Sequence, residues 1–199
     1  MPLDYKTTEK SLYQPKVSPS MVDVHEMVFI AVDGKGDPNT SAEYAAAIEV
    51  LYGISYTVKM SNKAILEYVV PPLEGLWNGD PNAGKSNFEW TALIRQPSFV
   101  TDDVFSAAKA ALAKKKPGLD TSKARLVTIT EGLCVQAMHV GSYDSEPATI
   151  AAMERYAVDN GCVIDLGARR HHEIYLSDPR KVAPESLKTV IRHPVRRVG

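Results

Sequence analysis

Glu173 and Tyr175 are the two residues whose types and spacing point most directly to chemistry. They alternate with Ile174 and Leu176, the period-two pattern of a half-buried strand, so the carboxylate and the phenol project from the same face. Asp178-Pro179 then predicts a turn. If this face lines a concavity, the carboxyl group has the surroundings of a general base, and the phenol can donate a hydrogen bond or position water.

Glu173 also has a structural interpretation, in which it pairs with Arg169, Arg170 or Arg180. A third interpretation keeps the site and omits the reaction. A carboxylate in a dry aromatic pocket attracts lipophilic cations through its charge and through cation–π contacts with its neighbours.

Other reactive side chains have spacings that favour structural roles. His139, His171 and His172 lack the spacing of a metal site, and adjacent strand residues such as His171 and His172 face opposite ways. Cys134 and Cys162 form no CxxC pair and are expected to be buried free thiols. We therefore expect neither a metal nor a cofactor.

Composition limits the class of protein. The chain has 199 residues, 44% hydrophobic and 24% charged, which is enough for one large domain or two small ones. A net charge of −1 argues against nucleic acid or a membrane surface as partner. The polar N-terminus has no signal-peptide core and no apolar run reaches the length of a membrane span, so we expect a soluble cytoplasmic protein of undefined oligomeric state.

Hydrophobic periodicity and turn residues predict the elements in order. The first part comprises an extended leader over residues 1–22, a strand over 25–33, a helix announced by the capping box Thr40–Glu43, strands over 65–70 and 88–94, and a loop over 73–87. The second part comprises a helix capped by Thr101, a hairpin of 124–130 with 133–140, a helix after Ser145, a strand over 171–176, a short helical turn at 184–187 and a closing strand over 189–195.

The two parts repeat one pattern at matched spacing. From Gly34 to Glu67 is 67 − 34 = 33 positions, and from Gly141 to Glu173 is 173 − 141 = 32 positions. This spacing predicts an α+β fold of two tandem βαββ units, about 23–100 and about 101–199, within one domain over 23–199. A groove between related halves is a usual place for a small ligand.

Longer stretches resemble the GyrI-like small-molecule-binding family, whose fold is of the SHS2 type. The second half carries HVGSYDSEPATIAAM, HEIYLSDPRK and PESLKTVIRHPV. VLYGISYTVKM, YVVPPLEGLW and ALIRQPSFVT, with EGLCVQAMHVGSYDSEPAT, resemble the branch described as cyclopropanoid cyclopropyl hydrolases. The resemblance implies an enzyme that detoxifies DNA-alkylating natural products such as yatakemycin and CC-1065. It also implies a stand-alone domain, since no helix-turn-helix segment precedes it.

The resemblance also implies site residues. Glu173 matches the central glutamate of the family by its place in HEIYL. For an aromatic cage around the ligand we nominate Trp77, Trp90, Tyr68 and Tyr52. Core packing would also explain the two tryptophans and Tyr52. The hypothesis is that Glu173 takes a proton from water while Tyr175 donates a hydrogen bond or positions that water. The alternatives are a non-catalytic protein that sequesters planar lipophilic or cationic compounds, and an inhibitor-type protein that interacts with DNA gyrase.

Overall fold

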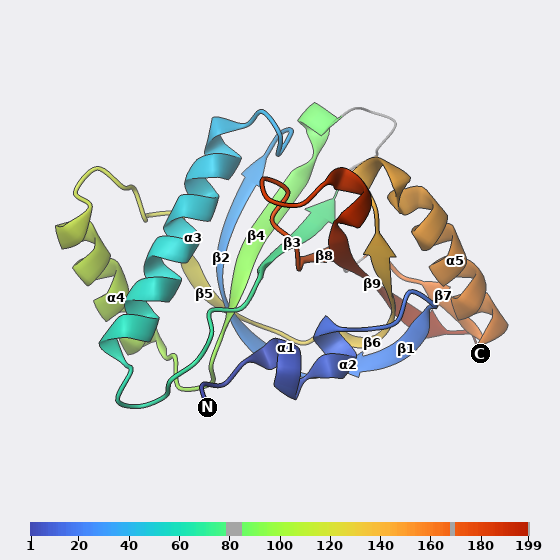
Figure 1. The fold of residues 1–199 in the computed structure, drawn as a ribbon, viewed down its shortest axis with the longest axis horizontal. Helices are drawn as coiled ribbons and strands as arrows, with labels where there is room; N and C mark the ends of the chain where they lie inside the picture. The colour runs from blue at the N-terminus through green and yellow to red at the C-terminus, as the bar shows by residue number, and fades with distance from the viewer. Residues whose placement is uncertain (79–84, 168–169, 199) are drawn as a thin grey trace. The chain divides into compact units, whose positions relative to one another are not determined.

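The computed structural model describes residues 1–78, 85–167 and 170–198, which divide into two compact units (Figure 1). Unit 1 comprises Met1–Thr8 and Met27–Ile129, and unit 2 comprises Glu9–Glu26 and residues 130–199. This division differs from the predicted one, because the helix and strand after residue 100 belong to unit 1. The predicted leader over 1–22 is also shared between the units.

Unit 1 is an antiparallel sheet with two long helices. Its elements are α1 (Tyr5–Thr8), β2 (Met27–Lys35), α3 (Ala42–Ser61), β3 (Leu73–Asn78), a 3-10 turn η2 (Lys85–Asn87), β4 (Glu89–Gln96), α4 (Asp102–Lys115) and β5 (Arg125–Ile129). The strand order is β3-β4-β2-β5. Helices α3 and α4 lie side by side (Figure 1), and Leu51, Ile54 and Phe105 join them to the core over β2 and β4.

Unit 2 has a similar antiparallel sheet but a single long helix among its described elements. Its elements are α2 (Lys10–Tyr13), β1 (Ser20–Val24), β6 (Gly132–Val140), a 3-10 turn η3 (Tyr143–Ser145), α5 (Glu146–Asp159), β7 (Cys162–Ile164), β8 (His171–Tyr175), a 3-10 turn η4 (Pro184–Ser186) and β9 (Lys188–Arg197). The strand order is β1-β6-β9-β8, with β7 also paired to β9. Met153 and Ala157 of α5 pack on Val135 and Ile191 of the sheet.

The matched topology confirms the predicted α+β class and its pair of βαββ units. In each unit one strand that follows the helix lies between two others, giving β3-β4-β2 in unit 1 and β8-β9-β6 in unit 2. Each sheet then adds one further strand, β5 beside β2 and β1 beside β6. In the sequence, β1 directly precedes β2 and β5 directly precedes β6. Each added strand therefore comes just before the strand that begins the βαββ pattern of the other unit.

Three local predictions are wrong, each for a physical reason. The predicted hairpin fails because β5 pairs with β2 while β6 pairs with β1 and β9. The strand predicted over 65–70 is an irregular segment joined to Leu3 by a parallel bridge at Tyr68, and the strand forms at β3, within the predicted loop. Residues 79–84 of that loop lie outside the described residues. The helix α3 is capped by Ser41 rather than Thr40, because the Ser41 hydroxyl accepts from the Tyr44 amide.

Gly34 gives a first testable prediction for the packing of unit 1. It lies opposite Trp90 across the β2–β4 pair, and a Cβ built at Gly34 would overlap the Trp90 indole ring. Because overpacking a closed core costs about 1–3 kcal/mol, Gly34→Ala is expected to lower the free energy of unfolding by that amount. Urea denaturation measures the change. A matched Gly167→Ala, where the nearest side-chain atom lies 4.0 Å away, should leave stability nearly unchanged.

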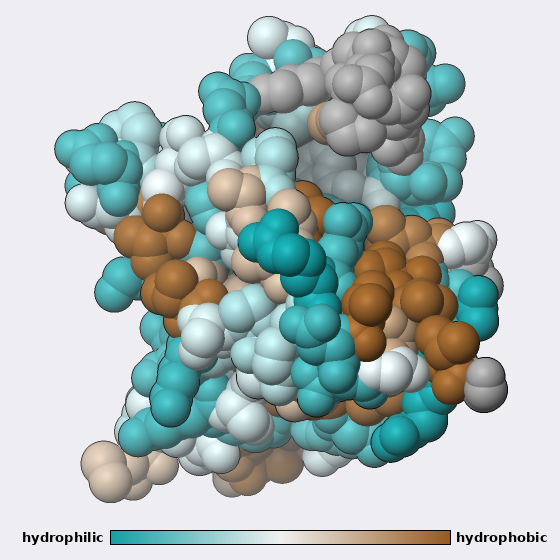
Figure 2. Space-filling view, turned by 90° about the vertical axis from the view of Figure 1, so that its right-hand side faces the viewer, coloured by the Kyte–Doolittle hydropathy of each residue, from teal (hydrophilic) through white to brown (hydrophobic). Residues whose placement is uncertain are grey.

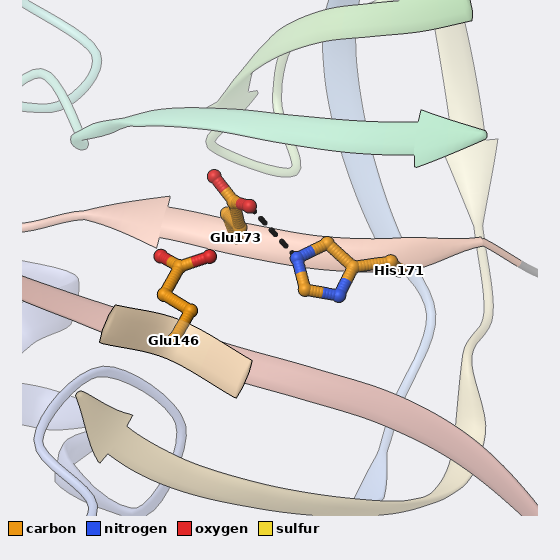
Figure 3. Close-up of side chains that lie close together, drawn as sticks. All are labelled: Glu146, His171 and Glu173. Atoms are coloured by element: carbon orange, nitrogen blue, oxygen red, sulfur yellow. Dashed lines mark hydrogen bonds and ion pairs between the residues drawn. The ribbon is translucent and has the colours of Figure 1, made fainter. Parts of the chain in front are cut away.

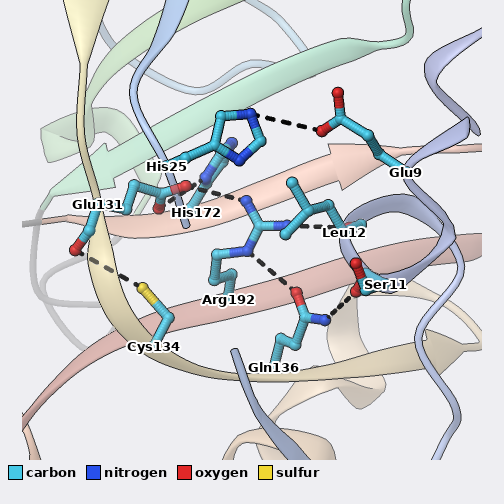
Figure 4. A network of polar contacts seen from close by, with 9 residues as sticks. All are labelled: Glu9, Ser11, Leu12, His25, Glu131, Cys134, Gln136, His172 and Arg192. Carbon is cyan, nitrogen blue, oxygen red and sulfur yellow. Dashed lines mark hydrogen bonds and ion pairs between the residues drawn. The ribbon is translucent and has the colours of Figure 1, made fainter. Parts of the chain in front are cut away.

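A buried ion pair fastens the N-terminal segment to the sheet of unit 2 (Figure 4). Arg192 on β9 is 1% exposed and donates to Glu131 Oε1 at 2.9 Å and to the Leu12 carbonyl at 2.9 Å. His172 Nδ1 lies 2.9 Å from Glu131 Oε2, and Arg192 Nε donates to Gln136. The guanidinium of Arg192 can be buried because each of its nitrogens has an acceptor. One of these acceptors is the Leu12 carbonyl, so the contact also holds this part of the predicted leader on the sheet.

The ion pair makes the stability of the protein depend on pH in acid. Burial opposes ionisation of Glu131, but His172 and Arg192 outweigh it and lower the pKa of Glu131 from 4.5 to about 2. A carboxyl group whose pKa is lower in the folded than in the unfolded protein stabilises the folded state at pH values above its unfolded pKa. This contribution is lost as the pH falls through about 4 towards 2. We expect a loss of about 3 kcal/mol over that range. Urea unfolding at stepped pH measures it, and a flat profile would contradict the assignment.

The surface that carries α5 mixes polar and apolar side chains (Figure 2). Large apolar residues with more than two fifths of their surface exposed in unit 2 include Val140, Val158, Leu166 and Val198. In Figure 2 the apolar groups on this face are separated by hydrophilic ones.

Of the helices in the described ranges, none combines the length and the hydropathy that crossing a bilayer requires.

Candidate functional site

Strand β8 places three polar side chains on one face. His171, Glu173 and Tyr175 alternate with His172 and Ile174, which are 1% and 0% exposed. Pairing with β9 holds this register, since Ile174 lies opposite Val190 in the core of the sheet. The predicted strand is confirmed, and so is the shared face of the carboxylate and the phenol.

Both oxygens of Glu173 have a hydrogen-bond partner on that face. The Tyr175 hydroxyl donates to Oε2 at 2.6 Å, and His171 Nε2 lies 2.8 Å from Oε1. The side chain of Glu173 is 13% exposed and that of His171 is 17% exposed, so the carboxylate is shielded yet still reaches the surface. Two partners on two oxygens hold the carboxylate plane in one orientation.

A second histidine extends this chain of contacts into the interior. His193 on β9 lies with its Nε2 2.6 Å from His171 Nδ1, and the two rings meet edge to face with centroids 4.8 Å apart. Burial lowers the pKa of His193 to about 3, and the neighbouring His171 contributes in the same direction. His193 is therefore a neutral imidazole at physiological pH.

One residue of η3 and the first residue of α5 complete the polar face. Tyr143 in η3 meets Tyr175 edge to face at 6.1 Å. Burial raises the pKa of Tyr143 to about 12, with smaller contributions from Glu173, Glu146 and Asp178. Tyr143 therefore keeps its proton and remains a donor. Glu146, 7% exposed, is the first residue of α5, where the helix dipole favours a negative charge.

Among the described side chains, one group brings possible metal-ligand atoms close together: Glu146, His171 and Glu173 (Figure 3). One atom from each lies within 4.8 Å of the others. Two ligands of one zinc ion lie at most about 4.2 Å apart, since each bond is about 2.1 Å. The group would have to contract to bind an ion, and His171 Nε2 already makes a hydrogen bond to Glu173. Sequence spacing alone could not bring Glu146 into this group.

Two of the three arginines predicted as ion partners of Glu173 can be assessed as follows. Arg180 pairs with Asp178 at 2.9 Å, and Arg169 is not among the described residues. The described partners of Glu173 are instead His171 and Tyr175.

The four aromatic residues nominated for ligand contact all lie in unit 1. Trp77 and Trp90 form a cross-strand pair, and Tyr44 contacts both rings, with centroids 5.9 Å and 4.9 Å away. Trp90 is 1% exposed and Tyr68 is fully covered, so both are placed as core residues. Trp77 keeps part of its surface open. A ligand contact for any of them stays a prediction.

Tyr52, the fourth nominee, lines an open groove between α3 and α4. Its ring stacks on Tyr56, with centroids 6.2 Å apart. The groove has a volume of about 510 Å³, and Met60, Leu112 and Lys115 also line it. This is a separate feature of unit 1.

Sequence reasoning missed His171, His193, Tyr143 and Glu146 as members of the polar face. Only His171 had a local signal, since it precedes Glu173 by two residues and must share its side of the strand. The other three reach the face through tertiary structure, from β9, from η3 and from the first residue of α5.

The protein combines paired βαββ units with a shielded carboxylate that lies among phenol rings. These features are typical of a small-molecule-binding domain of the α+β class. The model of the GyrI-like family, described as a GyrI-like small molecule binding domain, matches residues 18–196. The chain belongs to this family.

Solved structures agree with this assignment. An uncharacterized conserved protein from Listeria innocua is 46% identical, with 98% of this chain and 100% of that chain covered and a TM-score of 0.93. A protein described as a hydrolase from Listeria innocua is also 46% identical over the same shares, with a TM-score of 0.92. The EcmrR C-terminal domain, 14% identical over 90% of this chain and 98% of its own, has a TM-score of 0.55 and shares the fold alone. The comparison with curated proteins gave no match.

Proposed function

We propose that this protein is a hydrolase that binds planar lipophilic xenobiotics and opens the cyclopropane ring of cyclopropanoid DNA-alkylating compounds. The observation that carries the proposal is the shielded Glu173 carboxylate, oriented by Tyr175 and His171. The similar protein from Listeria innocua that is described as a hydrolase supports the reaction class.

The reaction needs one base and one stabilising donor. Water attacks the ring CH₂ as Glu173 takes one of its protons, and the breaking C–C bond sends its electrons into the conjugated dienone. The dienone becomes an aromatic phenolate, which then takes up a proton, so the sum is the addition of one water. A shielded carboxylate suits the first step, and hydrogen-bond donors aimed at the developing oxyanion suit the second.

The two phenols take different parts in this proposal. The Tyr175 hydroxyl already donates to Glu173, which makes it an orienting group for the base. Tyr143 has a hydroxyl that stays protonated, because its pKa is raised to about 12, and its ring lies against Tyr175. Tyr143 is therefore the better candidate to donate to the developing phenolate, and both rings offer faces to a flat chromophore.

A second candidate function is sequestration of lipophilic cations without turnover. The observation that favours it is the approach of Glu146 to Glu173, whose carboxylate oxygens belong to a group within 4.8 Å. Two neighbouring carboxylates attract one positive charge, and the adjacent phenol faces add cation–π contacts.

Removal of the Tyr175 hydroxyl tests its orienting role. Tyr175→Phe keeps the ring but removes the hydrogen bond to Glu173, and a hydrogen bond to a charged group contributes about 1.5–3 kcal/mol. We expect the turnover rate to fall about 10- to 100-fold while ligand affinity changes little. Steady-state kinetics measure both quantities. Tyr156→Phe on α5 is the matched control, and equal losses in both variants would contradict the role.

The proposed function is tested by incubating the purified protein with a cyclopropanoid and following products by mass spectrometry. A hydrolase yields free compound with the mass of one added water, in many turnovers per protein. Recovery of unchanged compound bound to protein would support sequestration. A single covalent adduct on the protein would contradict both candidates.

A further inference from the structure

We propose that His193 and His171 are positioning residues for Glu173, acting through a fixed pair of imidazole tautomers. His193 donates its Nε2–H to His171 Nδ1, which leaves the His171 proton on Nε2, where it donates to Glu173. The assignment rests on the hydrogen-bond geometry, and its catalytic meaning rests on the proposed function.

The short contact between the rings requires one proton. His193 Nε2 and His171 Nδ1 lie 2.6 Å apart, a distance at which one nitrogen must donate and the other must accept. The far side of His171 sets a second condition, because Nε2 lies 2.8 Å from Glu173 Oε1. A carboxylate can only accept, so His171 must carry a proton on Nε2.

Because His193 is neutral at physiological pH, two assignments meet both conditions. In the first, both rings are neutral with the proton on Nε2, and His193 donates to His171. In the second, His171 is doubly protonated and donates to both neighbours, and the proton of His193 moves to its Nδ1.

The environment of His193 decides between them. Its Nδ1 is buried and has no hydrogen-bond partner among residues 1–78, 85–167 and 170–198. The second assignment would put an N–H group at this position, and orphaned buried N–H groups are rare in native structures. The first assignment leaves only a bare lone pair there.

This assignment also bears on the group of Glu146, His171 and Glu173. A metal ion would need the lone pair of His171 Nε2, since a protonated nitrogen cannot be a ligand. With the proton held on Nε2 by His193, the group presents a hydrogen-bonded carboxylate and no metal site. The consequence for Glu173 is a fixed orientation, with His171 on one oxygen and Tyr175 on the other.

Nitrogen NMR of the protein labelled in histidine tests the assignment without any substrate. At neutral pH, His171 and His193 are expected to be protonated at Nε2 and unprotonated at Nδ1, and equimolar Zn²⁺ should leave both spectra unchanged. A doubly protonated His171, a proton on Nδ1 of either ring, or replacement of the His171 Nε2 proton by Zn²⁺ would overturn the proposal.

Variants at His193 test the positioning role. His193→Leu removes the donor and should lower kcat about 10- to 100-fold, the range for losing a side chain that orients a reactive group, with KM little changed. His193→Gln keeps an amide donor and should restore much of the rate and the His171 tautomer. His25→Gln, at a side chain 57% exposed in the same unit, is the control.

The outcomes separate this proposal from the proposed function. An unchanged rate in His193→Leu, with wild-type turnover present, would overturn the positioning role. Absence of turnover in the wild type would contradict the proposed function, and the NMR spectra would still decide the tautomers. If His193→Leu does not fold, failure of His193→Gln to keep both the tautomer and the rate would overturn the proposal.

Discussion

Replacement of Glu173 by glutamine is expected to reduce cyclopropane hydrolysis by about 10²- to 10⁴-fold, the range attributed to a general base. Glutamine has the shape of glutamate and keeps one oxygen to accept from Tyr175 or His171. It carries no charge and cannot take a proton from water. The change therefore removes the proton-accepting function and preserves the surrounding packing.

The measurement is single-turnover hydrolysis alongside ligand affinity by titration calorimetry. Glu185→Gln, at an exposed position in the same unit, is the matched control and should behave as the wild type. A fully active Glu173→Gln variant would remove Glu173 from the mechanism. Lost affinity for cations with no turnover in either protein would favour the sequestration function, with Glu173 as the electrostatic anchor.

Replacement of Arg192 by leucine is expected to have the largest effect on stability, a loss of about 3–5 kcal/mol. Arg192 is 1% exposed, and its removal would leave the Glu131 charge buried without its guanidinium partner. It would also release the Leu12 carbonyl and the Gln136 side chain from their donor. Urea denaturation measures the change, and Arg196→Leu, at an exposed position on the same strand, is the control.

A double variant distinguishes a buried ion pair from simple packing. Adding Glu131→Gln to Arg192→Leu removes the uncompensated charge, so the double variant is expected to be more stable than Arg192→Leu alone. Strictly additive losses would contradict the account. Amide hydrogen exchange of residues near Leu12 should rise in Arg192→Leu, since this segment is fastened to unit 2 by that side chain.

The sequence predicted most of what depends on local pattern. The strand face shared by Glu173 and Tyr175 follows from a period of two, and the helix predicted after Ser145 is observed as α5. The paired βαββ units were visible as matched spacing. These features are set by neighbours along the chain, so one sequence is enough to find them.

The partners of each strand could not be predicted in this way. The segments β5 and β6 are separated by Thr130 and Glu131, which favours a hairpin, yet each pairs with a strand far away in the sequence. Glu131 has a buried role as the acceptor of Arg192, and Gly132 turns the chain with a φ of +65°. The requirement to bury that ion pair is not visible in the local pattern.

The residues that form the site could likewise not all be predicted from local sequence pattern. Glu173 and Tyr175 lie on one strand, but His193 comes from β9, Tyr143 from η3 and Glu146 from the first position of α5. Tyr175, predicted as a donor to the ligand or to water, has its hydroxyl on Glu173. Whether a polar side chain faces a ligand or a neighbour depends on contacts between elements.

The most direct test of the central claim is hydrolysis of a cyclopropanoid in water enriched in the heavy oxygen isotope. A protein that adds water to the ring carbon gives a product that carries one heavy oxygen, with many product molecules per protein, and the Glu173→Gln variant gives almost none. Unchanged cyclopropanoid after incubation with folded, ligand-binding wild-type protein would contradict the account.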